Sequence, residues 1–242
     1  MSKSTAPLPD WELVLSSAAR LQRILPDAVL VGGTASALHA GHRFSRDADH
    51  VLVNLSVRFD QVLAQLESVA GWKTARVQRP VQILGSLDGI ETGVRQLVRE
   101  GPLETMVLDH RGARLTVPTM NEILRIKGVL ILKRNATRDY LDFVALADGM
   151  GDERLVQALQ SFDKLYQQDN GESPLQQLQA QLASAVPYDL EGTELSEYKN
   201  LVPRWHDWNV VKAACAHIST VIFDGVCDLA ADRSDDGGGK AS

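Results

Sequence analysis

The stretch VLVGGTASALHAGHRFSRDADHVLV, residues 29–53, holds the features that decide the fold of this chain. An apolar run ends at two adjacent glycines, small residues follow, and a second apolar run begins at two closely spaced aspartates. Because glycine adopts backbone conformations that other residues avoid, the glycine pair predicts a sharp turn between a strand and a helix. The order therefore predicts a buried strand at 28–31, a helix at 34–40 that Gly41 ends, and a strand at 47–55.

Asp47 and Asp49 are separated by a single residue at the start of the second predicted strand. Side chains two residues apart in a strand point to the same face, so these carboxylates are expected side by side, with Val51 and Val53 continuing that face into the core. Adjacent negative charges repel each other unless a cation lies between them. Mg²⁺ binds carboxylate oxygens and leaves positions open for substrate phosphates. The spacing therefore indicates a Mg²⁺ site, although acidic residues also occur at strand ends without a metal.

The glycine pair, Gly32 and Gly33, indicates a site for phosphate. A turn without side chains lets a phosphate group approach backbone N–H groups closely, and the N-terminus of the following helix adds partial positive charge. Thr34 contributes a hydroxyl group at the same place. Other motifs do not fit: the chain has no GxGxxG fingerprint and no GK[ST] loop, and an EF-hand beginning at Asp47 would lack its glycine and its glutamate.

The rest of the chain predicts an α+β protein. Asp10 is typical of the N-cap of a helix that ends before Pro26, and β-forming residues interrupted by glycines predict several short strands between 73 and 116. Apolar residues at helical spacing predict helices at 59–70, 120–133, 137–148, 153–167, 175–185 and 210–229. We therefore expect an α/β domain with a mixed sheet at 1–117, a helical domain at 118–230, and a disordered acidic, glycine-rich tail at 231–242.

The composition, with 44% hydrophobic and 23% charged residues, is that of an ordinary globular protein. No apolar run is long enough to span a bilayer and no signal peptide is evident, so we expect a soluble, cytoplasmic protein without a membrane partner. Cys215 and Cys227 form no paired motif, and free thiols fit a reducing cytosol. The net charge of −6 argues against a protein that coats nucleic acid over its whole surface.

Positive charge is concentrated in residues 111–138, which hold seven basic side chains and Glu122 as their single acidic one. From Gly151 onward, by contrast, 15 acidic residues face 7 basic ones. A local basic region in an acidic protein indicates a phosphate-bearing ligand, and solvated helix surfaces are the alternative. If an RNA binds here, its candidate contacts are Arg125, Lys133, Arg134 and Arg138.

Lys127 lies on an otherwise apolar predicted helix, where a buried amine would need a partner. It shares a face of that helix with Arg134, seven residues on, while Asp139 and Asp142 share a face of the next helix. These spacings favour a charged site. The alternative is that Thr137 caps the second helix and that Asp139, in its first turn, only stabilises the helix dipole.

The stretch at 29–53 resembles the signature of the DNA polymerase β-like nucleotidyltransferases, which is Gly-Gly, a short helix and two carboxylates separated by one residue. More narrowly, GGTA followed by Arg43, Ser45, Asp47 and Asp49 resembles the AbiEii/AbiGii-type toxin branch. The stretch NEILRIKGVLILKRNATRDYLDFVAL is similar to the lysine-bearing helix of that branch and its Arg-Asp-x-x-Asp run.

This resemblance implies a nucleotidyltransferase fold, an enzyme, and a toxin of a toxin–antitoxin pair. It implies Mg²⁺ as cofactor, a nucleoside triphosphate as substrate, an RNA (tRNA) end or a protein hydroxyl as acceptor, and an antitoxin protein as partner. Gly32, Gly33 and Thr34 would hold the nucleotide, Asp47 and Asp49 would bind the metal, Lys127 would contact phosphate, and Asp139 would complete the site.

The wider superfamily has a third metal carboxylate on a later strand, for which Glu91 and Glu104 are the candidates here. Without it, the alternative is a catalytically impaired nucleotide- or partner-binding protein on the same fold. His50 stands where such strands are usually aliphatic, and we expect it to face away from the aspartates. Trp205 and Trp208 fit either a stacking surface for a base or the anchor of a terminal helix.

Overall fold

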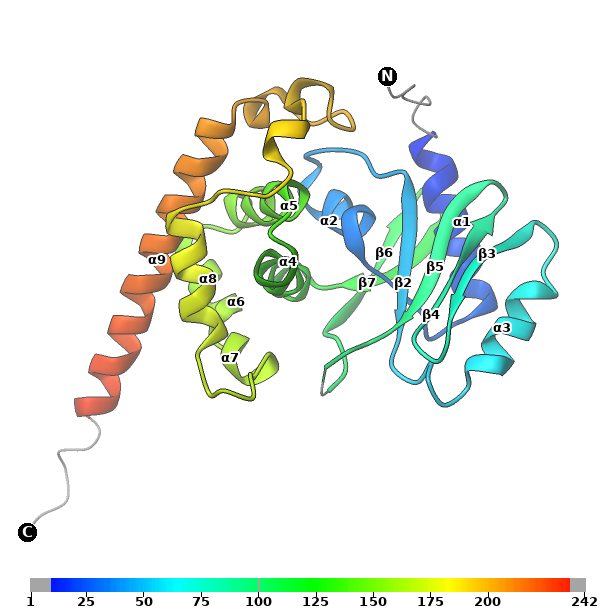
Figure 1. The fold of residues 1–242 in the computed structure, drawn as a ribbon, viewed down its shortest axis with the longest axis horizontal. Coiled ribbons are helices and arrows are strands. Elements are labelled where there is room, and N and C mark those ends of the chain that lie inside the picture. The colour runs from blue at the N-terminus through cyan, green and yellow to red at the C-terminus, as the bar shows by residue number, and fades with distance from the viewer. Residues whose placement is uncertain (1–9, 100, 236–242) are drawn as a thin grey trace, which may run out of the picture. The chain divides into compact units, whose positions relative to one another are not determined.

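A computed structural model describes residues 10–99 and 101–235 of the chain, apart from the side chains of 226–235 (Figure 1). The chain divides into two compact units. Unit 1 comprises Met1–Ile123 together with Glu197–Leu201, and unit 2 comprises Leu124–Ser196 together with Val202–Ser242. The first holds the strands and the second is helical.

Unit 1 is built on a five-stranded mixed sheet with the strand order β1-β2-β5-β4-β3. Strands β2 and β5 run parallel, and the other neighbouring pairs are antiparallel. The expected mixed sheet is thus confirmed. The strands are β1 (Val29–Leu30), β2 (Asp47–Leu52), β3 (Trp72–Gln78), β4 (Gln82–Leu87) and β5 (Ile90–Gln96). A separate two-stranded sheet pairs β6 (Thr105–His110) with β7 (Ala113–Pro118).

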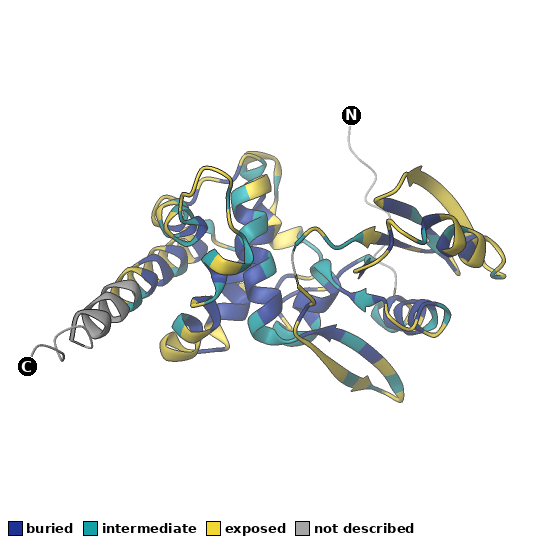
Figure 2. Cartoon of the chain, turned by 90° about the horizontal axis from the view of Figure 1, so that it is seen from below, coloured by how far each residue is buried: buried dark blue, intermediate teal, exposed yellow. Residues whose placement is uncertain are grey.

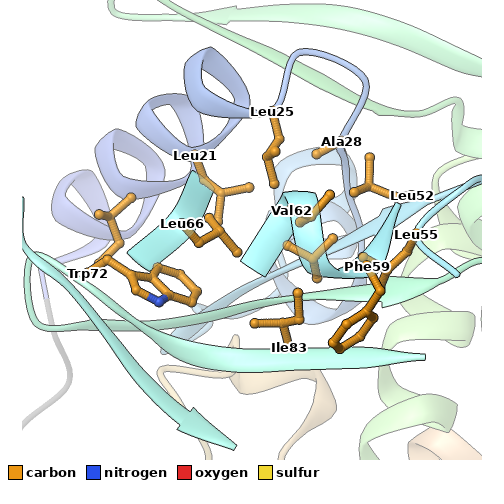
Figure 3. Packing of buried hydrophobic residues seen from close by; sticks show 12 residues of the cluster. Leu21, Leu25, Ala28, Leu52, Leu55, Phe59, Val62, Leu66, Trp72 and Ile83 are labelled. Carbon is orange, nitrogen blue, oxygen red and sulfur yellow. The ribbon is translucent and has the colours of Figure 1, made fainter. Parts of the chain in front are cut away.

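Helices α1 (Trp11–Ile24) and α3 (Phe59–Glu67) supply the apolar side chains that pack on one face of the five-stranded sheet. Asp10 caps α1 as expected, since its carboxylate accepts a hydrogen bond from the Glu12 N–H. Figure 3 shows Leu21 of α1 and Leu66 of α3 above Ile83 of the sheet. We call this covered side the core face, and the opposite side the open face.

The side chains of β2 alternate between these two faces, but the face that enters the core is not the one that carries the valines. Ala48, His50 and Leu52 are buried on the core face, whereas Val53 is 60% exposed. The expectation that Val51 and Val53 enter the core was therefore wrong. The aspartates share their face with Val51, and α1 and α3 cover the other face.

Helix α2 (Gly32–Ala40) begins at the glycine pair itself, two residues earlier than the pattern predicts. Gly41 ends it in the left-handed conformation, with φ +59°, as expected from a C-terminal glycine. The short strand β1 thus passes directly into a helix.

Unit 2 consists of helices, several of which are largely buried (Figure 2). Helix α5 is buried from Thr137 to Ala147 except at Arg138. Its N-terminus is capped by the Asp189 carboxylate, which accepts from both the N–H and the hydroxyl of Thr137. Thr137 is therefore not the cap. The helices are α4 (Met120–Arg134, whose first turn belongs to unit 1), α5 (Thr137–Asp148), α6 (Asp152–Leu159), α7 (Phe162–Leu165), α8 (Pro174–Ala183) and α9 (Trp208–Asp235).

The tryptophans near the start of α9 are anchors in unit 2. Trp205 is 3% exposed, and the Trp208 ring meets the edge of Tyr140 with 6.0 Å between ring centroids. Helix α9 continues to Asp235. The remainder of the expected disordered tail, residues 236–242, lies outside the described residues.

Candidate active site

The turn between β1 and α2 needs glycine at both positions, for different reasons. Gly32 has φ +72°, which L side chains rarely adopt. A Cβ at Gly33 would lie 2.6 Å from Nη2 of Arg43 and 3.0 Å from Oγ of Ser45. The second glycine is therefore required by the close approach of two polar side chains.

Asp47 and Asp49 project from β2 beside this turn. Asp47 Oδ1 accepts a hydrogen bond of 2.7 Å from the Ser45 hydroxyl. A Cβ at Gly32 would lie 3.7 Å from Cβ of Asp49, so the turn and the second aspartate are neighbours. Thr34 is buried, and its hydroxyl donates to the Asp47 carbonyl oxygen at 2.5 Å. Thr34 thus joins the start of α2 to the start of β2.

Arg43 packs behind the glycine turn, and sequence reasoning had noted it only as part of a motif. Its side chain is 4% exposed, it donates to the Phe44 carbonyl oxygen, and it lies 5.9 Å from the centre of the Tyr198 ring. The Phe44 N–H donates to the Lys199 carbonyl oxygen at 2.8 Å. Residues 197–201 therefore hold the loop between α2 and β2 from the outside.

Glu91 is the better of the two candidates for a third carboxylate. It lies in register with Asp47 on the neighbouring parallel strand, so both side chains point to the open face about 5 Å apart along the sheet. Glu104 lies before β6, and its carboxylate accepts from the Thr119 hydroxyl at 3.4 Å. Among the described side chains, those of 10–99 and 101–225, no three of His, Cys, Asp or Glu are already grouped to hold a metal ion.

His50 follows Asp49 on β2, lies on the core face and is fully buried. Burial lowers the pKa of its imidazole to about 4, because the charged ring would lose its hydration, and a backbone interaction at Ala48 opposes this only in part. His50 is therefore neutral at physiological pH and belongs to the packing of the sheet, as expected from its position.

This lowered pKa predicts a loss of stability in acid. The unfolded chain binds a proton at His50 with the ordinary pKa of about 6.5, whereas the folded chain does so only near 4. The stabilisation is thus complete above about pH 6.5 and declines as the pH falls toward 4, by about 2 kcal/mol at pH 5. The free energy of unfolding in urea at pH 7.5 and at pH 5 measures this loss. In His50→Leu the difference in free energy of unfolding between the two pH values should be smaller by that amount. An unchanged difference would contradict the lowered pKa of His50.

Lys127 and Asp139 come together in unit 2, within a network of four charges of which three are buried and Arg134 is exposed. Lys127 Nζ lies 2.6 Å from Oδ2 of Asp142 and 3.5 Å from Oδ1 of Asp139. Arg134 donates to both oxygens of Asp139 at 2.8 and 3.0 Å. Lys127 is 3% exposed and both carboxylates are fully buried, so each ion needs its partners. Asp142, the nearer partner of Lys127, was predicted from the sequence only to share a helix face with Asp139.

The basic residues between 111 and 138 are divided between the two units. Arg111 and Arg114 belong to unit 1, and the other five belong to unit 2. Arg125 is 3% exposed and donates to the Ala158 carbonyl oxygen at 2.9 Å, so its prediction as an RNA contact was wrong. Its guanidinium fills a buried position between helices rather than facing solvent. Lys133 and Arg138 are exposed.

Exchanging Gly33 for alanine tests the close packing at the turn. The new methyl group would displace the Arg43 guanidinium and the Ser45 hydroxyl, and the displaced hydroxyl would no longer fix Asp47. We expect a stability loss of about 1–3 kcal/mol, as for overpacking elsewhere, measured by chemical unfolding. Gly192→Ala is the matched control, because no atom lies within 4 Å of its Cβ position and its φ is not positive. Equal stability of Gly33→Ala and the wild type would contradict the packing described here.

The glycine turn, the paired carboxylates and the mixed sheet together define a nucleotidyltransferase, and comparisons with known proteins agree. Residues 15–213 match the profile of the family described as nucleotidyl transferase AbiEii toxin, Type IV TA system. The chain belongs to this AbiEii family, so the resemblance seen in the sequence is confirmed.

Solved structures support the fold. A candidate nucleotidyltransferase from H. pylori superimposes with a TM-score of 0.56 at 16% identity, over 90% of this chain and 96% of that one. An antigenic nucleotidyltransferase-like protein from Paracoccidioides brasiliensis gives a TM-score of 0.52 at 19% identity, over 77% and 94% of the two chains. At these identities the likeness concerns the fold.

Curated relatives in mycobacteria are much longer than this chain. The probable transport protein MmpL11 of Mycobacterium bovis and the heme uptake protein MmpL11 of Mycobacterium tuberculosis are each 32% identical over 241 residues. The match covers 90% of this chain but 23% of each relative. In the part of the chain that the structure describes, none of the helices has the length and apolar composition that crossing a membrane requires.

Proposed function

We propose that the protein transfers a nucleotide from a nucleoside triphosphate to a hydroxyl group of an acceptor, with an RNA (tRNA) end or a protein side chain as the acceptor. The observation that carries this proposal is the position of Asp47 and Asp49 on one strand face beside the Gly32–Gly33 turn. In such a site the hydroxyl oxygen attacks the α-phosphorus, and the bond to the bridging oxygen breaks to release pyrophosphate.

The donor set suits Mg²⁺. Both carboxylates offer hard oxygen ligands, and Asp49 is 30% exposed, so a cation could reach it from solvent. Two carboxylates leave coordination positions for water and for phosphate oxygens. When bound, the metal supplies positive charge that polarises the phosphoryl group and stabilises the transition state. Asp47, Asp49 and, by its register, Glu91 are the residues that would hold it.

The other residues bind and orient in this proposal. The backbone N–H groups at Gly32 and Gly33 hold phosphate oxygens at the start of α2, where the helix dipole favours negative charge. Ser45 fixes the orientation of the Asp47 carboxylate through its hydroxyl. Glu91, in register with Asp47, would accept the proton of the attacking hydroxyl. Lys127 would contact phosphate, and Asp139 would hold that amine in place.

The family further supports a biological role. AbiEii proteins are described as toxins of a toxin–antitoxin system, and we propose that this chain is the toxin of such a pair, acting in the cytoplasm and restrained by an antitoxin protein. Transfer to an essential RNA or protein would explain toxicity. Growth arrest on expression of the wild type, but not of an Asp47→Asn variant, would support this role.

The competing function is nucleotide or partner binding without chemistry. To separate the two, the purified protein is incubated with each of four labelled nucleoside triphosphates and total RNA, with Mg²⁺ or with a chelator. We expect label in RNA or in protein with one nucleotide, only when Mg²⁺ is present. Nucleotide binding without incorporation into any acceptor would favour the binding protein.

A further inference from the structure

The open face of the five-stranded sheet continues from the aspartates across three more strands. Strand register places Asp49, Gly93, Leu84 and Arg76 in one row, and Asp47, Glu91, Ser86 and Lys73 in the next. Residues in register on neighbouring strands point to the same face. Each row therefore begins at an aspartate of β2 and ends at a cation of β3.

The two cations at the far end, Lys73 and Arg76, are exposed, and neither forms an ion pair with a described side chain of 10–99 or 101–225. The next exposed arginine of the strand region, Arg79, is paired with Asp60 instead. Lys73 and Arg76 therefore place uncompensated positive charge on the open face of a protein whose net charge is −6.

A third cation lies between the aspartates and this pair. Arg95 of β5 is in register with Val51 and Gln82, so it also points to the open face. Its Nη2 lies 3.9 Å from Oδ1 of Asp49, its side chain is 45% exposed, and its guanidinium lies against the side-chain amide of Gln82. Three cations, Arg95, Arg76 and Lys73, therefore lie on this face between Asp49 and the edge strand.

We propose that this open face binds the sugar–phosphate backbone of an RNA acceptor, whose hydroxyl is presented at Asp47 and Asp49. The inference rests on the proposed nucleotidyl transfer and names the acceptor's path. Strands lie about 4.8 Å apart, so Arg76 is about 15 Å from Asp49 along its row, and Arg95 lies on β5 in the adjacent row, in register with Val51. In this proposal Lys73, Arg76 and Arg95 contact phosphates of a single RNA strand.

Edge strands also carry charged residues that prevent pairing with other chains. Preventing such pairing would not require Lys73 and Arg76 to lie on the same face as the aspartates. It would also not require a further cation, Arg95, on the central strand β5. The exposed cations Lys133 and Arg138 in unit 2 are the sequence-based alternative for RNA binding. Reversing two charges on the open face and two charges on unit 2 distinguishes between these surfaces.

The test measures binding of unfractionated transfer RNA over a salt series from about 50 to 200 mM. The variants are Lys73→Glu/Arg76→Glu on the open face and Lys133→Glu/Arg138→Glu on unit 2. Arg23→Glu/Arg114→Glu is the matched control, since both arginines are exposed and lie outside the five-stranded sheet. We expect Lys73→Glu/Arg76→Glu to lower affinity at least about tenfold at low salt and to reduce the salt slope by about 1–2.

The proposed path would be overturned if Lys73→Glu/Arg76→Glu bound RNA with the wild-type affinity. It would also be overturned if the control variant lost as much affinity, or if only Lys133→Glu/Arg138→Glu lost affinity. The proposed transfer is judged separately with Asp47→Asn. This variant should bind RNA with the wild-type salt slope while incorporating no label. If Asp47→Asn still transfers nucleotide, the proposed role of Asp47 in catalysis is wrong, but the proposed RNA path is not affected. If Lys73→Glu/Arg76→Glu binds RNA and transfers nucleotide as the wild type does, only the path fails.

Discussion

Asp47→Asn and Asp49→Asn are each expected to abolish nucleotide transfer, with a loss of at least about a thousandfold. Each exchange removes one negative oxygen from the pair that would hold the metal, and metal stabilisation of a phosphoryl transition state contributes several kcal/mol. Label incorporation at saturating Mg²⁺ and nucleotide measures the effect.

The fold should survive both exchanges. Asparagine keeps an oxygen that can accept from Ser45, and neutralising one of two neighbouring carboxylates removes a repulsion. Asp109→Asn is the matched control, because its carboxylate lies on β6 and accepts from the Gly112 N–H, which an amide oxygen can replace. Full activity of either active-site variant, with unchanged thermal unfolding, would remove that aspartate from the mechanism.

Lys127→Met should lower the free energy of unfolding by about 3–5 kcal/mol, because it leaves a buried carboxylate without the amine that lies 2.6 Å from it. From the sequence alone we would expect methionine to be tolerated, since it keeps most of the side-chain stem. The network with Asp142 and Asp139 reverses that expectation. Urea unfolding of the variant and the wild type at pH 7 gives the difference.

The double variant Lys127→Met/Asp142→Leu separates stability from function. Removing both ions should recover much of the lost stability, as replacing buried ion pairs by apolar residues often does. If Lys127 contacts the triphosphate, the recovered protein should still bind nucleotide at least about tenfold more weakly than the wild type. Wild-type nucleotide affinity in a stable double variant would assign Lys127 to unit 2 packing alone. A double variant no more stable than Lys127→Met would contradict the importance of the pair.

Local chemistry in the sequence was sufficient for most of the elements. The glycine pair, the alternation around Asp47 and Asp49, and the change to helical spacing after Pro118 each depend on a few neighbouring residues, so they can be read without knowing the fold. The same is true of Asp10 as a cap and of Gly41 as a helix end. From these motifs came the α+β class and the carboxylates of the candidate site.

Contacts between residues far apart in the chain decided the rest. The packing of α1 and α3 on the sheet, rather than the sequence of β2, determined that His50 is buried and Val53 exposed. Strand register brought Glu91 beside Asp47, and helix packing buried Arg125 and placed Asp142 against Lys127. Register and burial depend on which faces meet after the chain has folded. No local pattern contains that information, because the same alternating strand can turn either face to the core.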